Sequence, residues 1–195
     1  YPGCAIPVEE GGRGGPTGAD GGISYEWTVK LGQHDKASFV NKVGAKSFNE
    51  PPPSYEPPDT GWTHTSNWVA LELTKKAKVR IEVARQEGVP FSTSTGMATA
   101  RNQLVPGIAV YMGWDNTSCE DHRYNTQGDV DWTVGIQFIG NQLNEKGRSV
   151  AVYEADLKKG KYSIAIGGTP KVLPSYPAGN CDVLDPTCYA YTGNH

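Results

Sequence analysis

A chain of 195 residues has room for one large domain or two small ones, and its 18 Lys and Arg against 21 Asp and Glu give a formal net charge of −3. That balance excludes the clustered positive charge that binding to nucleic-acid phosphates requires. The sequence also has no apolar run of about 18 residues, the length that a membrane-spanning helix needs.

The composition favours strands and turns. The 24 glycines and 14 prolines are spread along the chain, a distribution typical of many short strands rather than helices. Residues 1–22 hold eight glycines and three prolines, so we expect an irregular N-terminal arm. The chain begins at Tyr1 without a methionine or a signal-peptide pattern, which fits the mature form of an exported protein or a trimmed chain.

Alternation of apolar and polar residues predicts a series of short strands. The clearest signal spans residues 67–84, where two alternating runs flank a lysine-rich stretch, and this pattern predicts a β-hairpin. A weaker pattern with a glycine kink covers residues 38–48, and a proline-rich loop follows at 49–60. The other predicted strands cover residues 23–31, 106–114, 132–139, 149–154 and 161–166.

Eight or nine short strands without crossover helices predict an all-β fold. We expect a single domain over residues 1–195, an antiparallel β-sandwich of jelly-roll type with long loops and a loop-rich tail at 167–195. In such a fold the loops at the ends of the sheets carry function.

The four cysteines indicate the redox compartment. None forms a Cys-x-x-Cys pair, which argues against a structural zinc site. Four cysteines allow three pairings; we favour Cys4–Cys119, which would tie down the N-terminal arm, and Cys181–Cys188, which would close a short loop. Disulfides imply an oxidising compartment, and the alternative is four reduced, buried cysteines in a cytosolic protein.

Two of the four histidines are candidate metal ligands. His64 follows Trp62 by two residues at the entrance to a strand, and residues i and i+2 of an extended segment point to the same side. His122 lies in a long polar loop near Cys119, whereas His34 lies in a turn-like stretch and His195 ends the chain. Two imidazoles suit copper, zinc or nickel when a third donor completes the site.

The triplet Trp62-Thr63-His64 resembles the Trp-x-His element of the copper-binding surface proteins of methane-oxidising bacteria, the CorA and MopE family. In that family the tryptophan is oxidised to kynurenine and binds Cu(I) together with the histidine two residues on and a second histidine further along. The resemblance implies kynurenine at Trp62 and a ligand at His64. For the second histidine we favour His122 over His34, because His122 lies in the long loop next to Cys119.

The same resemblance implies where the protein works. Members of the family are exported, lie on the outer-membrane surface and are made when copper is scarce. We therefore expect an exported copper-binding protein that acquires or handles copper, with a partner at the outer-membrane surface or an uptake protein.

A second metal is suggested by acidic residues around the His122 loop. Oxygen donors at this density suit calcium, although their spacing does not match an EF-hand loop. The alternative is a solvated acidic loop with Asx turns. The residues concerned are Asp115, Asp121, Asp129 and Asp131.

We expect a binding protein rather than an enzyme, because the sequence has no nucleophile elbow, no His-Glu-x-x-His motif and no phosphate loop. The rival hypothesis is an extracellular carbohydrate-binding or adhesion module with structural calcium. In that hypothesis aromatic rings form a sugar-stacking face. The candidate rings are Trp62, Trp68, Trp114, Tyr55 and Tyr124.

Overall fold

The computed structural model of the chain describes residues 25–41, 66–87, 104–115, 136–142, 144 and 146–168 in full. Five two-residue strands are described by their backbone alone: β1 (Glu9–Glu10), β3 (Lys42–Val43), β4 (Gly61–Trp62), β8 (Tyr124–Asn125) and β12 (Gly193–Asn194). Every regular element in these ranges is a strand, so the predicted all-β class is confirmed. No helix in the described part of the chain is long and apolar enough to cross a membrane.

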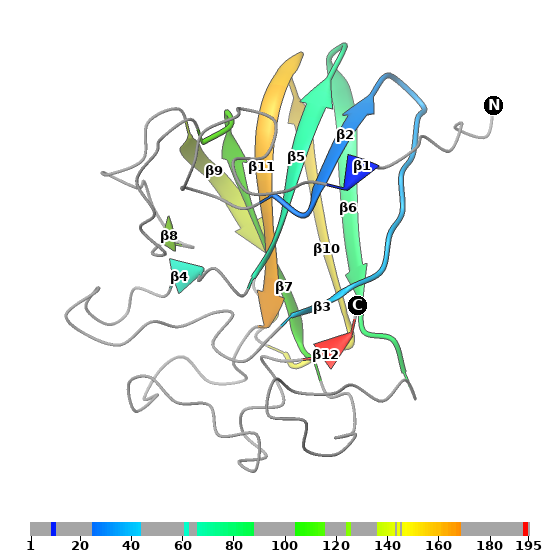
Figure 1. Ribbon diagram of the computed structural model, residues 1–195, viewed down its shortest axis with the longest axis vertical. Helices are drawn as coiled ribbons and strands as arrows, with labels where there is room; N and C mark the ends of the chain where they lie inside the picture. Colours follow the sequence, from blue (N-terminus) through cyan, green and yellow to red (C-terminus); the bar gives the residue numbers. More distant parts are fainter. Residues whose placement is uncertain are drawn as a thin grey trace.

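Two layers of strands form a sandwich (Figure 1). The larger sheet has six strands in the order β1-β2-β5-β11-β7-β9, and the smaller sheet has two, β10 and β6. Two further pairs, β12 with β3 and β4 with β8, lie outside both sheets. The longer strands are β2 (Trp27–Leu31), β5 (Asn67–Leu73), β6 (Ala77–Ala84), β7 (Pro106–Met112), β9 (Gln137–Gln142), β10 (Val150–Leu157) and β11 (Gly160–Gly168).

One pairing departs from the predicted antiparallel arrangement. β2 runs parallel to β5, with Trp27 opposite Val69 and Leu31 opposite Leu73, whereas the other described pairs are antiparallel. A parallel pair requires a long connection back to the starting end of the sheet. β2 and β5 therefore finish at the same end of the sandwich, and the long connection between them includes the Trp62 segment.

The predicted hairpin over residues 67–84 is wrong. β5 ends at Leu73 and β6 begins at Ala77, but β5 pairs with β11 while β6 pairs with β10. Residues 74–76 carry the chain from one layer to the other, and residues 158–159 do the same between β10 and β11. Alternation identified both strands, but it does not reveal whether consecutive strands share a sheet.

The other predicted strands differ from the observed ones mainly at their ends. β2, β7, β10 and β11 lie on the predicted segments. The 38–48 signal yields only the two residues of β3 among those described, because residues 37–41 have irregular backbone. β9 starts later than the predicted 132–139 segment and extends to Gln142, while residues 132–135 lie outside the described ranges.

Apolar side chains of both layers meet between the sheets. Leu71 of β5, Val83 of β6 and Ile164 of β11 are each at most 5% exposed in this core. The opposite face of the larger sheet is buried as well, since Trp68 is 2% exposed and all residues 162–168 of β11 are buried. Such unbroken burial is typical of strands covered on both faces.

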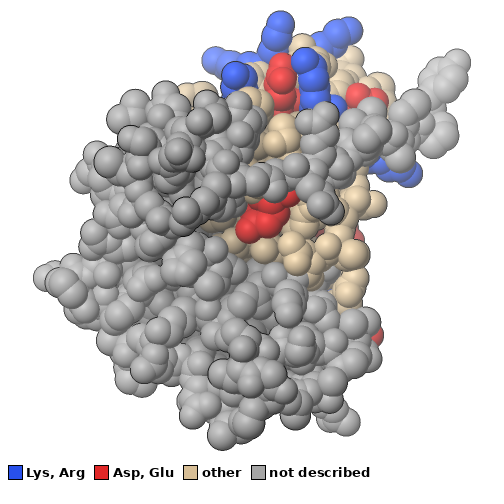
Figure 2. Space-filling view, in the orientation of Figure 1, with Lys and Arg blue, Asp and Glu red and all other residues tan. Residues whose placement is uncertain are grey.

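Lysines gather at one end of the sandwich, where the chain crosses between layers. Lys75 and Lys76 lie in the connection from β5 to β6, and Lys158 and Lys159 lie in the connection from β10 to β11. The two connections are neighbours because Leu73 of β5 pairs with Gly160 of β11. Figure 2 shows the Lys and Arg side chains clustered at this end, at the top of the view.

Candidate metal centre

A short two-stranded ribbon brings together the two segments that contain the predicted ligands. β4 and β8 pair antiparallel, with Gly61 opposite Asn125 and Trp62 opposite Tyr124. They lie side by side at the left of Figure 1, although they are 62 positions apart in the sequence. The backbone of Trp62 is therefore paired with that of Tyr124, which follows His122 by two positions.

Most of the predicted site residues lie outside the described residues. This holds for His64, His122 and the side chain of Trp62 among the copper ligands. It also holds for all four cysteines and for three of the four predicted calcium ligands, Asp121, Asp129 and Asp131. Among the residues that are described, no group of three or more His, Cys, Asp or Glu side chains is placed to hold a metal ion.

His34 is the one histidine whose surroundings are described. It is exposed and has a φ of 66°, in a turn that is closed by the Gly32 amide donating to Asp35 Oδ2 at 2.6 Å. The neighbouring Gln33 side chain donates to the carbonyl of Lys76 at 3.2 Å. This turn therefore lies beside the connection from β5 to β6, at the end of the sandwich where β5 finishes.

Asp115, the fourth predicted calcium ligand, is buried with 3% of its surface exposed. Its backbone amide donates to the hydroxyl of Tyr25 at 2.8 Å, and that hydroxyl is hydrogen-bonded to Ser163 Oγ at 2.7 Å. Ser163 in turn donates to the carbonyl of Gly113 at 2.7 Å. Burial raises the pKa of Tyr25, so this phenol stays neutral and ties the chain after β7 to the middle of β11.

The partly buried carboxyl group of Glu26 lies beside the start of β5, which begins three residues after the Trp62-Thr63-His64 motif. The Trp68 amide donates to Glu26 Oε2, and the Glu26 amide donates to the Trp68 carbonyl at 2.9 Å. Desolvation by burial raises the pKa of Glu26 to about 7, against the opposing effect of hydrogen bonds from the Trp68 backbone and the Asn67 side chain. Alternation in the predicted strand over residues 23–31 places Glu26 on the solvent side, so its partial burial is not expected from the sequence pattern.

The structure weakens the sugar-stacking hypothesis. Trp68 is 2% exposed and packs against Tyr111 with 5.7 Å between ring centroids, so its ring cannot meet a sugar. Trp114 donates from Nε1 to the carbonyl of Tyr162 at 3.1 Å, and Lys161 Nζ lies 4.4 Å from the centroid of its ring. Tyr55 and the side chains of Trp62 and Tyr124 lie outside the described residues.

The fold and the ribbon define an all-β sandwich with a candidate metal-binding segment beside it. No protein-family model matches the chain, and no curated protein matches it. Among solved structures the chain is similar to CorA of Methylomicrobium album BG8, described as a surface-associated copper-binding protein important in the copper acquisition of that organism. The two chains share 17% sequence identity with a TM-score of 0.47, over 71% of this chain and 82% of that chain.

Proposed function

We propose that this protein is an exported copper-binding protein that holds one Cu(I) ion through His64, His122 and a kynurenine formed from Trp62. The role we propose is copper acquisition or handling rather than catalysis. The observation that carries the proposal is the pairing of β4 with β8, which joins the two segments that contain these residues.

The register of the ribbon supports this choice of ligands. In an antiparallel pair, one step forward on one strand meets one step back on the other, so two further steps from Trp62 and Tyr124 would set position 64 opposite position 122. Residues directly opposite have Cβ atoms about 4.5–5.5 Å apart on one face of the ribbon. Position 62 would share that face with position 64. A continued ladder would thus gather all three proposed donors on one side.

The donor chemistry fits copper. An unmodified indole N–H is a hydrogen-bond donor and offers no lone pair, so Trp62 becomes a ligand only after its ring is opened to the aniline-type amine of kynurenine. Two imidazoles and one such amine form a set of three nitrogen donors that Cu(I) accepts. Because thiolate and thioether ligands are absent from this set, tight binding would depend on the rigid placement that a paired ribbon supplies.

The position of His34 argues against it as the second histidine. β2 is parallel to β5, so the chain that follows Leu31 emerges beside the end of β5, about 20 Å from the start of that strand. His64 precedes the first residue of β5, Asn67, by three positions, and three residues of extended chain reach at most about 10 Å. His34 and His64 would therefore be held at opposite ends of β5.

The proposal extends to the setting of the protein. Export, a location at the outer-membrane surface and a surface or uptake partner follow from the sequence resemblance to the CorA and MopE family. The proposed absence of a catalytic role follows instead from the lack of catalytic motifs in the sequence. Calcium bound by the acidic loop remains part of the proposal for Asp121, Asp129 and Asp131. The burial of Asp115 and the bond from its amide to Tyr25 favour a structural position for that residue instead.

The test is the mass of the peptide that contains residues 61–67, measured on protein purified after growth with copper, together with its copper content. The proposal predicts a mass at Trp62 that corresponds to kynurenine and about one copper ion per chain, which His64→Ala removes. An intact indole in a protein that retains no copper would contradict the proposal.

A further inference from the structure

A partly open cavity of about 400 Å³ lies between the two sheets. The smaller sheet has two strands against the six of the larger sheet, and its most extensive contacts with that sheet are with β7 and β9. On the other side, residues of β6 face residues of β2, β5 and β11 across the cavity, and residues 37–40, here called the strap, complete its lining. The cavity is the space that remains between the strap, β6 and the larger sheet, and we call it the slot.

Most of the surface that lines the slot is apolar. The larger sheet supplies aliphatic side chains from three strands, and the other layer contributes residues 79–84 of β6 with residues 85–86 that follow it. Phe39 of the strap closes the outer side by stacking on Trp27, with 3.9 Å between ring centroids and 27° between ring planes. The aliphatic residues of the larger sheet that line the slot are Val29, Leu31, Val69, Leu71, Ile164 and Ile166.

Such a space is costly if it stays empty. Protein interiors are packed as densely as organic crystals, and apolar atoms beside a void lose their dispersion contacts. Leu31, Phe39 and Ile81 pack on the core but remain partly exposed. Water would gain few hydrogen bonds from these side chains. An apolar molecule, in contrast, would recover the lost contacts and cover the exposed carbon.

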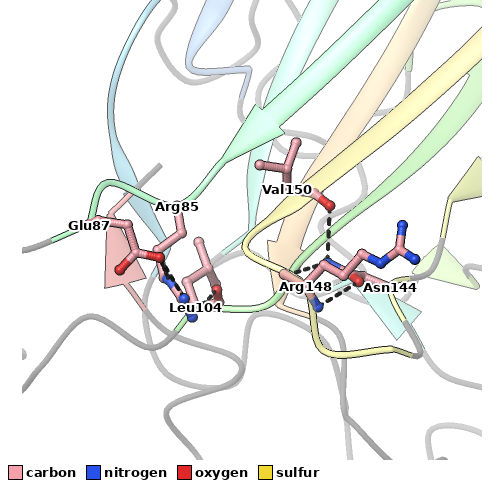
Figure 3. Close-up of polar contacts among 6 residues, drawn as sticks. All are labelled: Arg85, Glu87, Leu104, Asn144, Arg148 and Val150. Carbon is pink, nitrogen blue, oxygen red and sulfur yellow. Dashed lines mark hydrogen bonds and ion pairs between the residues drawn. The ribbon is translucent and has the colours of Figure 1, made fainter.

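The charges at the mouth of the slot are balanced. Arg80 forms ion pairs with Glu82 at 2.8 Å and with Glu154 at 3.1 Å. Arg85 pairs with Glu87 at 2.6 Å and also donates to the carbonyl of Leu104 at 3.3 Å, as Figure 3 shows. Because both guanidinium groups already pair with carboxylates, neither is placed to bind an anionic ligand group, and the mouth of the slot favours an uncharged ligand.

We infer that the slot is a binding site for a neutral, elongated apolar molecule such as a single alkyl chain. The part of β6 that lines it, residues 79–84, is about 17 Å long, which suits an elongated ligand. A methylene group is about as large as a water molecule, which occupies about 30 Å³, so roughly a dozen methylene groups would fill the slot.

The experiment uses the full chain, freed of metal by a chelator, and the neutral fluorescent probe N-phenyl-1-naphthylamine. The probe should bind saturably with one site per chain, and straight-chain alcohols should displace it. Each added methylene should tighten binding roughly fourfold until the slot is full, after which the gain should stop.

Two variants fill the slot, and one matched variant leaves it open. Ala37→Phe adds a ring from the strap, and Val83→Phe adds one from the buried face of β6; the first should fold even if the second does not. Both should weaken probe binding at least tenfold, while Val150→Phe, on β10 outside the slot and 38% exposed, should not.

The assignment would be overturned if the wild-type chain did not bind the probe saturably. It would also be overturned if Ala37→Phe bound the probe as tightly as wild type. His64→Ala should bind the probe normally, so a failure here is independent of the copper proposal.

Discussion

Replacing Glu26 by glutamine should make the stability of this protein less sensitive to pH. Burial raises the pKa of the Glu26 carboxyl from 4.5 to about 7 in the folded chain. Between those two values the folded state holds a proton that the unfolded state has released, so stability is greatest below about pH 4.5 and is lost as the pH rises to about 7. Glutamine keeps an oxygen that accepts from the Trp68 amide and carries no charge at any pH.

The size of the effect follows from the pKa difference. A difference of roughly 2.5 pKa units corresponds to about 3 kcal/mol, an upper figure for a group that retains some access to water. Urea denaturation followed by tryptophan fluorescence, at intervals from pH 4 to pH 8, gives the free energy of unfolding of both proteins. The advantage of Glu26→Gln over wild type should grow by as much as about 3 kcal/mol across this range.

A carboxyl with the opposite shift supplies the control. Hydrogen bonding to Arg80 lowers the pKa of Glu154, so the folded state favours its charged form. The difference between Glu154→Gln and wild type should therefore change in the opposite direction as the pH rises. A Glu26→Gln difference that stays flat, or that follows the direction of Glu154→Gln, would refute the assignment of a partly buried, destabilised charge at position 26.

Three further predictions concern hydrogen bonding, packing and strand register. Tyr25→Phe removes the hydroxyl that joins Asp115 to Ser163, and because a buried amide loses its acceptor it should lower the free energy of unfolding by about 1–3 kcal/mol in chemical denaturation. Gly140→Ala places a Cβ atom 2.8 Å from the Tyr153 hydroxyl of the facing sheet, so it should lower the free energy of unfolding by roughly 1–3 kcal/mol. A smaller loss of stability in a Tyr153→Phe background would confirm that the two groups clash. If the β4–β8 ladder continues, Thr63→Cys with Arg123→Cys should form a disulfide that peptide mapping detects, whereas Thr65→Cys with Arg123→Cys, two residues out of register, should not.

The sequence predicts the fold class well and the strand partners poorly. Alternation in residues 67–84 reports which side chains of β5 and β6 turn inward, and both strands exist. Pairing depends on contacts between distant segments, which is why β5 joins β11 and β6 joins β10. The parallel arrangement of β2 and β5 was missed for the same reason, since an antiparallel partner would give a similar pattern.

Burial of both faces of the larger sheet explains the remaining errors. Trp68 was a candidate ring only in the rival sugar-binding hypothesis, and its side of β5 is covered as well, since Trp68 is 2% exposed. Glu26, the residue before β2, is likewise partly buried, against the Trp68 backbone. Alternation distinguishes two faces of a strand, but it cannot show that the second face is also removed from water.

The copper content of two histidine variants tests the central claim most directly. His122→Ala and His34→Asn would be purified after growth with copper, and the copper-to-protein ratio of each would be compared with wild type. Asparagine suits the φ of 66° at position 34, so that change should leave the turn intact. The account predicts loss of copper from His122→Ala and full retention by His34→Asn. Retention by His122→Ala, or loss from His34→Asn, would contradict the assignment of a site on the β4–β8 ribbon.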